Sequence, residues 1–138
     1  MSNNSLNDHL SHLLSQANKH LSRQLNADGV SLDQWRVMKL LSDDGGQPMG
    51  HLADALALGL PTVSKLVDRM VNEALLYRVP DPDDRRRVRI FISEKGKALL
   101  ATQSELVREY ETRVEGDMGS EEMRRLREMI EQLIERIK

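Results

Sequence analysis

Cysteine is absent from the 138-residue sequence, and long apolar runs, a strong net charge and aromatic residues are also missing or scarce. Without cysteine the chain cannot form disulfides, thiolate metal sites or thiol redox sensors. No apolar segment approaches the ~20 residues that a membrane-spanning helix needs. The N-terminal stretch MSNNSLNDHL lacks the basic start and apolar run of a signal peptide. We therefore expect a cytoplasmic protein.

Motifs that carry catalysis are also missing. The sequence has no Gly-rich phosphate loop, no nucleophile elbow and no His-Glu metal motif. Asp83 and Asp84 are neighbouring carboxylates, but the arginines that follow them keep both ionised and make them poor general acids. His9 and His12 are spaced i, i+3, with His20 further on, and this spacing could hold a metal. Without cysteine or a clear carboxylate partner we interpret them as exposed histidines. We expect no enzyme activity, no cofactor and no metal.

The residues that are present indicate a helical protein. Only 3% are aromatic, while Leu, Met and Ala are frequent, which favours helices over a β-sandwich. Apolar residues at three- and four-residue steps predict six helices. Ser31 with Gln34 forms a capping box, and Ser93 and Ser120 are further predicted N-caps. The predicted helices begin near Leu6, Ser31, Pro48, Pro61, Ser93 and Ser120.

Between the fourth and fifth predicted helices the apolar step changes to two. Val88, Ile90 and Ile92 face one side of a strand, and PDPDD supplies the turn of a β-hairpin. The order ααααββαα describes a mainly α fold with a small β wing, a winged helix-turn-helix. We expect one domain over 1–138, with dimerisation helices at 1–28 and 94–138, the winged helix-turn-helix at 31–93 and its wing at 76–92.

Positive charge gathers in this central part although the net charge is −2. Residues 61–92 hold seven Lys or Arg against five Asp or Glu. A recognition helix and a wing contact the major and minor grooves of DNA. The DNA-contacting candidates are Thr62, Ser64, Lys65 and Arg69 on the helix and Arg85, Arg86, Arg87 and Arg89 on the wing. The alternatives are an ordinary solvated helix face and a loop held by internal salt bridges.

From Leu52 to Lys97 the sequence resembles the multiple antibiotic resistance regulator (MarR) family of bacterial winged-helix transcription factors. The resemblance lies in LADAL, TVSKLVDRMV, YRVPDPDDRRRV and IFISEKG, and it is most specific at Asp84-Arg85-Arg86, which matches the Asp-x-Arg pattern of the family's wing. It implies that Arg86 reaches into the minor groove and that Asp68 steadies this arginine. Asp84 is expected to steady the turn.

The sequence departs from the family at three positions. Ala57 and Gly59 occupy the turn where Gly and a Ser or Thr cap are usual, so the recognition helix is expected to lack a side-chain cap. Ala74 replaces the usual Gly before the wing. Because a left-handed conformation would cost Ala roughly 1 kcal/mol, we expect the helix to run on slightly there.

The terminal helices predict a dimer. In the last helix Met123, Leu126, Ile130, Leu133 and Ile137 step 3, 4, 3, 4, like a coiled-coil seam. A two-fold dimer would place two recognition helices about 34 Å apart and read a near-palindromic operator. The alternative is that the terminal helices pack back on their own domain.

The resemblance also implies a small anionic or phenolic effector in a cleft between the dimerisation and DNA-binding parts. Candidate contacts are His12, Trp35, Arg36, Met38 and His51, with Arg69 as a second candidate for a carboxylate. The alternative, which the sequence favours for Trp35 and Met38, is that they belong to the core. We expect a homodimeric transcription regulator, a repressor released by a small molecule. The alternatives are a winged-helix protein-interaction module without DNA binding and a small ligand- or metal-binding protein.

Overall fold

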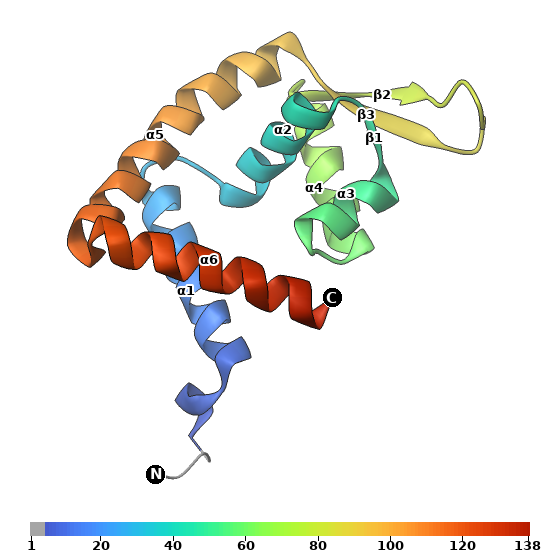
Figure 1. Ribbon diagram of the computed structural model, residues 1–138. Helices are drawn as coiled ribbons and strands as arrows, with labels where there is room; N and C mark the ends of the chain where they lie inside the picture. Colours follow the sequence, from blue (N-terminus) through green and yellow to red (C-terminus); the bar gives the residue numbers. More distant parts are fainter. Residues whose placement is uncertain (1–4) are drawn as a thin grey trace.

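The structure, a computed structural model, describes residues 5–138, which form six α-helices, a short 3-10 helix and a small sheet that projects at one side (Figure 1). The first four residues of the predicted ranges 1–138 and 1–28 lie outside the described part. The elements are η1 (Leu6–Asp8), α1 (Leu10–Ala27), α2 (Leu32–Asp44), β1 (Gln47–Pro48), α3 (Met49–Leu56), α4 (Leu60–Asn72), β2 (Leu76–Pro80), β3 (Val88–Ile92), α5 (Glu94–Met118) and α6 (Ser120–Ile137). Within residues 5–138 no helix is both long and apolar enough to cross a bilayer.

Two of the three predicted N-caps are confirmed. The Gln34 N–H donates to Ser31 Oγ over 3.4 Å at the start of α2, and the Gly96 N–H donates to Ser93 Oγ over 3.0 Å at the start of α5. The prediction for Ser120 was wrong, because Ser120 is already helical and Gly119 is the N-cap of α6. Gly119 is the single residue between α5 and α6, and the chain changes direction there. It does so at a φ of 98°, which glycine adopts without strain.

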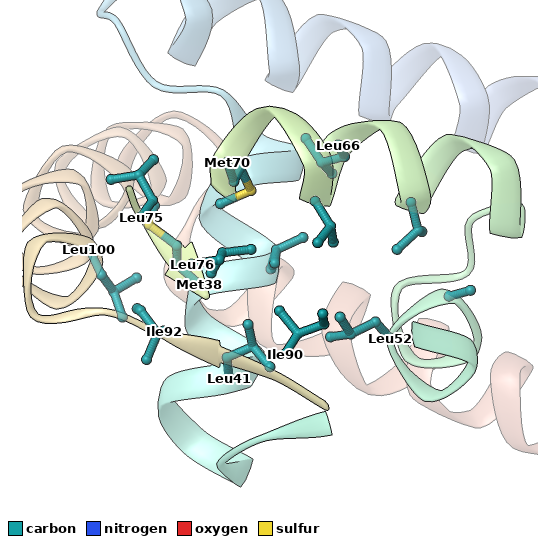
Figure 2. Packing of buried hydrophobic residues seen from close by; sticks show 14 residues of the cluster. Met38, Leu41, Leu52, Leu66, Met70, Leu75, Leu76, Ile90, Ile92 and Leu100 are labelled. Carbon is teal, nitrogen blue, oxygen red and sulfur yellow. The ribbon is translucent and has the colours of Figure 1, made fainter. Parts of the chain in front are cut away.

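The main core lies between the helix-turn-helix, the inner face of the sheet and the start of α5. Figure 2 shows Met38 of α2, Leu52 of α3, Met70 of α4 and Ile90 of β3 converging there, and each is fully buried. α4 contributes Val63, Leu66, Val67 and Met70 to this core. A second cluster joins the end of α1 to the middle of α5, and consists of Leu25, Val30, Leu32 and Val107.

The sheet contains the predicted hairpin and one strand that the sequence did not reveal. β2 and β3 pair antiparallel, with Leu76 opposite Ile92 and Pro80 opposite Val88. The additional strand β1 pairs with the other edge of β3 through Gln47 and Pro48, which gives the order β1-β3-β2. Two residues are too short to show an alternating pattern, and one of them is a proline that also suits a helix start.

The prediction that the fourth helix runs on through Ala74 was wrong. α4 ends at Asn72, and Ala74 adopts a left-handed φ of 61°. The Leu75 N–H then donates to the Met70 carbonyl over 2.9 Å, and the chain turns so that Leu75 and Leu76 enter the core at 2% exposure each. Burying two leucines stabilises the fold by about 3–6 kcal/mol, which exceeds the ~1–2 kcal/mol cost of the left-handed alanine.

Candidate nucleic-acid interface

The exposed side of α4 carries the residues predicted to contact DNA. Thr62, Lys65 and Arg69 are exposed and Ser64 is half-buried. Gly59 is the N-cap and provides no side-chain cap, as its identity predicted. The first two turns of α4 therefore present small polar groups and one flexible cation, a combination suited to base edges and phosphates.

The turn of the wing is shaped by its aspartates. Asp81 is buried, and its Oδ1 accepts the Asp83 N–H over 2.9 Å. This backbone hydrogen bond, with help from the Arg89 guanidinium, keeps the pKa of Asp81 below its usual range. Asp84 Oδ1 accepts the Arg86 N–H over 3.0 Å and lies 3.4 Å from Arg86 Nε. The side chain of Arg86 is 92% exposed at the end of the hairpin, so it is free to enter a groove.

Arg89 lies in β3, next to the pair that closes the hairpin, and it is also paired with Pro48 of β1. Its Nε is 3.3 Å from Asp81 Oδ2, and its Nη1 donates to the Gly46 carbonyl over 3.4 Å. Gly46 also touches Phe91, since a Cβ at this glycine would lie 2.3 Å from two ring carbons. Arg89 therefore ties the wing to the loop after α2, a role that the run of arginines alone did not indicate.

Asp68 has a different partner from the one that the sequence suggested. It pairs closely with Arg78 of β2, whereas Arg86 lies beside Asp84. The prediction that Asp68 steadies Arg86 was therefore wrong. Arg86 is on the far turn of the hairpin, while Arg78 is in the middle of the strand that packs on α4. The charge pattern of the sequence did not single out Arg78, although the step of two places it on the same face of the hairpin as its partner Ile90.

A cleft of about 750 Å³ opens between α3, α4 and the wing. Three arginines line it from the wing, Arg78, Arg86 and Arg87, with Ser64 from α4. Asp54 is the one acidic residue in the lining. Guanidinium groups form paired, charge-assisted hydrogen bonds with phosphate oxygens, so this cleft suits the backbone of a nucleic acid.

The predicted effector contacts do not form one site. His51 lines the cleft beside the wing, Met38 is fully buried in the core, and His12 is half-buried on α1. Only Trp35 and Arg36 come together, in a shallow groove of about 350 Å³ between α2 and α3. The residues that complete this groove are Lys39, Leu40, Asp43, Ala55 and Leu56.

Both groove residues are held by neighbouring helices. Trp35 Nε1 donates to Ser104 Oγ over 3.0 Å, and Arg36 Nη2 donates to Asn18 Oδ1 over 2.9 Å. The indole and guanidinium are thereby fixed in place before any ligand arrives. Among residues 5–138 no group of three His, Cys, Asp or Glu side chains is placed to hold a metal ion.

Comparison with known proteins identifies the family. The family model described as MarR family matches residues 28–87, from the end of α1 to the wing. The HTH-type transcriptional regulator MhqR of Bacillus subtilis is 31% identical over 91 residues, which cover 66% of this chain and 63% of MhqR.

Solved structures agree with the sequence match. A probable transcriptional regulator from Pseudomonas aeruginosa superimposes with a TM-score of 0.83 at 28% identity, covering 94% of this chain and 99% of its own. NadR, solved in complex with 4-hydroxyphenylacetate, has a TM-score of 0.75 at 26% identity and covers 96% and 97% of the two chains. With its helix-turn-helix, arginine-bearing wing and terminal helices, this chain belongs to the MarR family.

Proposed function

We propose that this protein is a cytoplasmic, homodimeric transcriptional repressor without enzyme activity, which binds a near-palindromic operator and leaves it when a small phenolic or anionic molecule binds. The observation that carries the proposal is the arginine-lined cleft between α4 and the wing. In this reading α4 enters the major groove and Arg86, at the end of the wing, enters the adjacent minor groove. Arg85 and Arg87, both exposed on the same turn, contact phosphates.

The dimer is proposed to form through the terminal helices, 1–28 and 94–138. α1 and α6 cross each other at the end of the molecule away from the wing (Figure 1). Between them lies an apolar groove of about 410 Å³, with Leu10 and Met129 exposed by 53% and 67%. Apolar residues at this density on two neighbouring helices are typical of a protein–protein interface. A second copy would cover the seam and align two copies of α4 on one face of the duplex.

The groove at Trp35 and Arg36 is the proposed effector site. An indole face and a guanidinium are the groups that recognise an aromatic ring bearing a carboxylate. NadR, the relative solved with 4-hydroxyphenylacetate, supports this chemical class. Because α2 carries the groove and Arg89 ties the loop after α2 to the wing, a ligand there is placed to change the angle of the wing.

Footprinting on the DNA upstream of the protein's own gene tests the proposal. We expect two protected half-sites about 34 Å apart, centre to centre, and loss of the flanking minor-groove protection in Arg86→Ala. A phenolic acid such as 4-hydroxyphenylacetate should reduce protection of both half-sites together. A winged-helix module that binds only proteins would protect no DNA, and its associations would tolerate both Arg86→Ala and added salt.

A further inference from the structure

Among the described residues one ion pair joins the recognition helix to the wing. Asp68 of α4 pairs with Nη2 of Arg78 in β2. Arg86 and Arg89, in contrast, find their carboxylate partners within the wing itself. The Asp68 and Arg78 side chains remain partly exposed, at 60% and 39%. The pair therefore lies on the surface, where the helix and the wing would both meet the duplex.

The position of Arg78 differs from that of the arginines on the turn. It occupies the middle of β2, opposite the buried Ile90, so its backbone is fixed by the hairpin and its side chain points into the cleft. Asp68 is its one side-chain partner among residues 5–138, and the contact uses a single nitrogen. A guanidinium has five N–H donors in a planar fork. Most of them therefore remain available for a second acceptor, such as a phosphate.

The two acids near the cleft have different surroundings. Asp68 holds an arginine, whereas Asp54 lines the cleft from α3 and forms no ion pair within the described part of the chain. On a DNA-facing surface an unpaired carboxylate repels the phosphates, and its neutralisation strengthens binding. A carboxylate that orders an arginine has the opposite effect, since a free arginine loses its rotamer freedom when it binds.

On the basis of the proposed DNA-binding function, we propose that Arg78 contacts a DNA phosphate in the cleft. Asp68 acts as a positioning residue that orders the Arg78 guanidinium before the duplex arrives. The pair thereby sets the spacing at which α4 and the wing engage the two grooves. Arg78 adds a fixed contact in the middle of the interface to the contacts of the flexible arginines on the turn.

Fluorescence-anisotropy titrations across salt concentrations test the inference, with labelled duplexes tiled over the upstream DNA of the protein's gene. We expect Asp68→Asn to weaken binding about fivefold or more, because ordering of the arginine is lost. The matched control Asp54→Asn should strengthen binding. Arg78→Ala should weaken it and reduce the salt slope by about two for a dimer, one phosphate contact in each protomer.

A further variant separates charge from geometry. Arg78→Lys keeps the positive charge, so the salt slope should stay close to that of the wild type. Affinity should nevertheless fall, because an ammonium cannot bond to a phosphate and to Asp68 through one planar fork. Circular dichroism and size-exclusion chromatography confirm that each variant is folded and dimeric. If Asp68→Asn does not fold, Arg78→Lys decides, and an affinity equal to that of the wild type overturns the inference.

The outcomes distinguish this inference from the proposed function. If the wild type binds DNA and Arg86→Ala weakens binding, but Asp68→Asn strengthens it as Asp54→Asn does, the positioning role of Asp68 is overturned and the proposed function stands. If the wild type binds none of the duplexes at any salt concentration, the proposed function fails and the inference fails with it. Opposite changes in DNA affinity for Asp68→Asn and Asp54→Asn support both the inference and the proposed function.

Discussion

Gly96 links the wing to the long helix α5, and its replacement by alanine is expected to destabilise the protein. Gly96 is buried in the first turn of α5, and its N–H donates to the side chain of the Ser93 cap. A Cβ there would lie 2.3 Å from the Leu75 carbonyl oxygen and 2.7 Å from Ile92 Cγ1. The carbonyl cannot easily move, because it accepts the Ser93 N–H and the Ser93 hydroxyl, both over 3.0 Å. The start of α5 must therefore shift away from the sheet.

The magnitude follows from two opposing effects. Alanine in place of glycine favours a helix by about 0.5–1 kcal/mol, while forcing one extra carbon into a packed site costs about 1–3 kcal/mol. We expect a net loss of about 1–2 kcal/mol for Gly96→Ala. Gly116 lies in the same helix, and a Cβ there would meet nothing within 4 Å. Gly116→Ala is therefore the matched control and should gain about 0.5 kcal/mol from helix propensity alone.

Urea unfolding followed by circular dichroism measures both variants. The protomer concentration must be held constant, because the stability of a dimer depends on it. With an m-value of about 2 kcal/mol/M, Gly96→Ala should lower the midpoint by about 0.5–1 M, and Gly116→Ala should raise it slightly. Equal increases in the urea midpoint for the two variants would contradict the predicted clash, since they would show that α5 does not begin against the Leu75 carbonyl.

Three further predictions concern the wing, the dimer and the effector groove. The pKa of Asp81 is lowered in the folded protein, so the contribution of this carboxylate to stability is complete above about pH 4 and is lost as the pH falls further. The difference in urea midpoint between wild type and Asp81→Asn should therefore shrink from neutral pH to pH 3. A difference that stays constant over this range would contradict the prediction. Leu133→Glu in the α1–α6 groove should raise the dissociation constant of the dimer at least about a hundredfold in analytical ultracentrifugation. The control Glu128→Gln should leave this constant unchanged, and an unchanged constant for Leu133→Glu would place the interface elsewhere. Arg36→Ala should lower the affinity for a phenolic acid about tenfold in calorimetry and leave operator binding unchanged; unchanged ligand affinity would remove Arg36 from the site.

Local patterns predicted most of the fold. The three- and four-residue steps identified the helices, the two-residue step identified the hairpin, and Ser31 and Ser93 marked helix starts that the structure confirms. β1 gave no such pattern, because it has only two residues and depends on pairing with β3. Ala74 was misjudged for a similar reason. Its left-handed conformation is unfavourable locally and is stabilised by the burial of Leu75 in a distant part of the core.

The sequence predicted where the candidate site lies more accurately than it predicted which residues contact each other there. The charge pattern located the wing, and the structure places its arginines beside α4. The charge pattern did not show that Asp68 pairs with Arg78, or that Arg89 bonds to the Gly46 carbonyl. Each of these partners is set by how α2 and α4 pack on the sheet. The effector candidates are separated for the same reason: His51 lines the cleft, Met38 lies in the core, His12 lies on α1, and only Trp35 and Arg36 share a groove.

The most direct test of the central claim is the salt dependence of DNA binding for the wild type and Arg86→Ala, measured by fluorescence anisotropy on the upstream duplexes. We expect the logarithm of the association constant to fall steeply and linearly with the logarithm of the salt concentration, with a slope of about −0.9 for each phosphate contact. Arg86→Ala should bind clearly more weakly and still saturate at one dimer per site. Weak binding that does not depend on salt, and is the same for both proteins, would contradict the claim that α4 and the wing form a DNA interface.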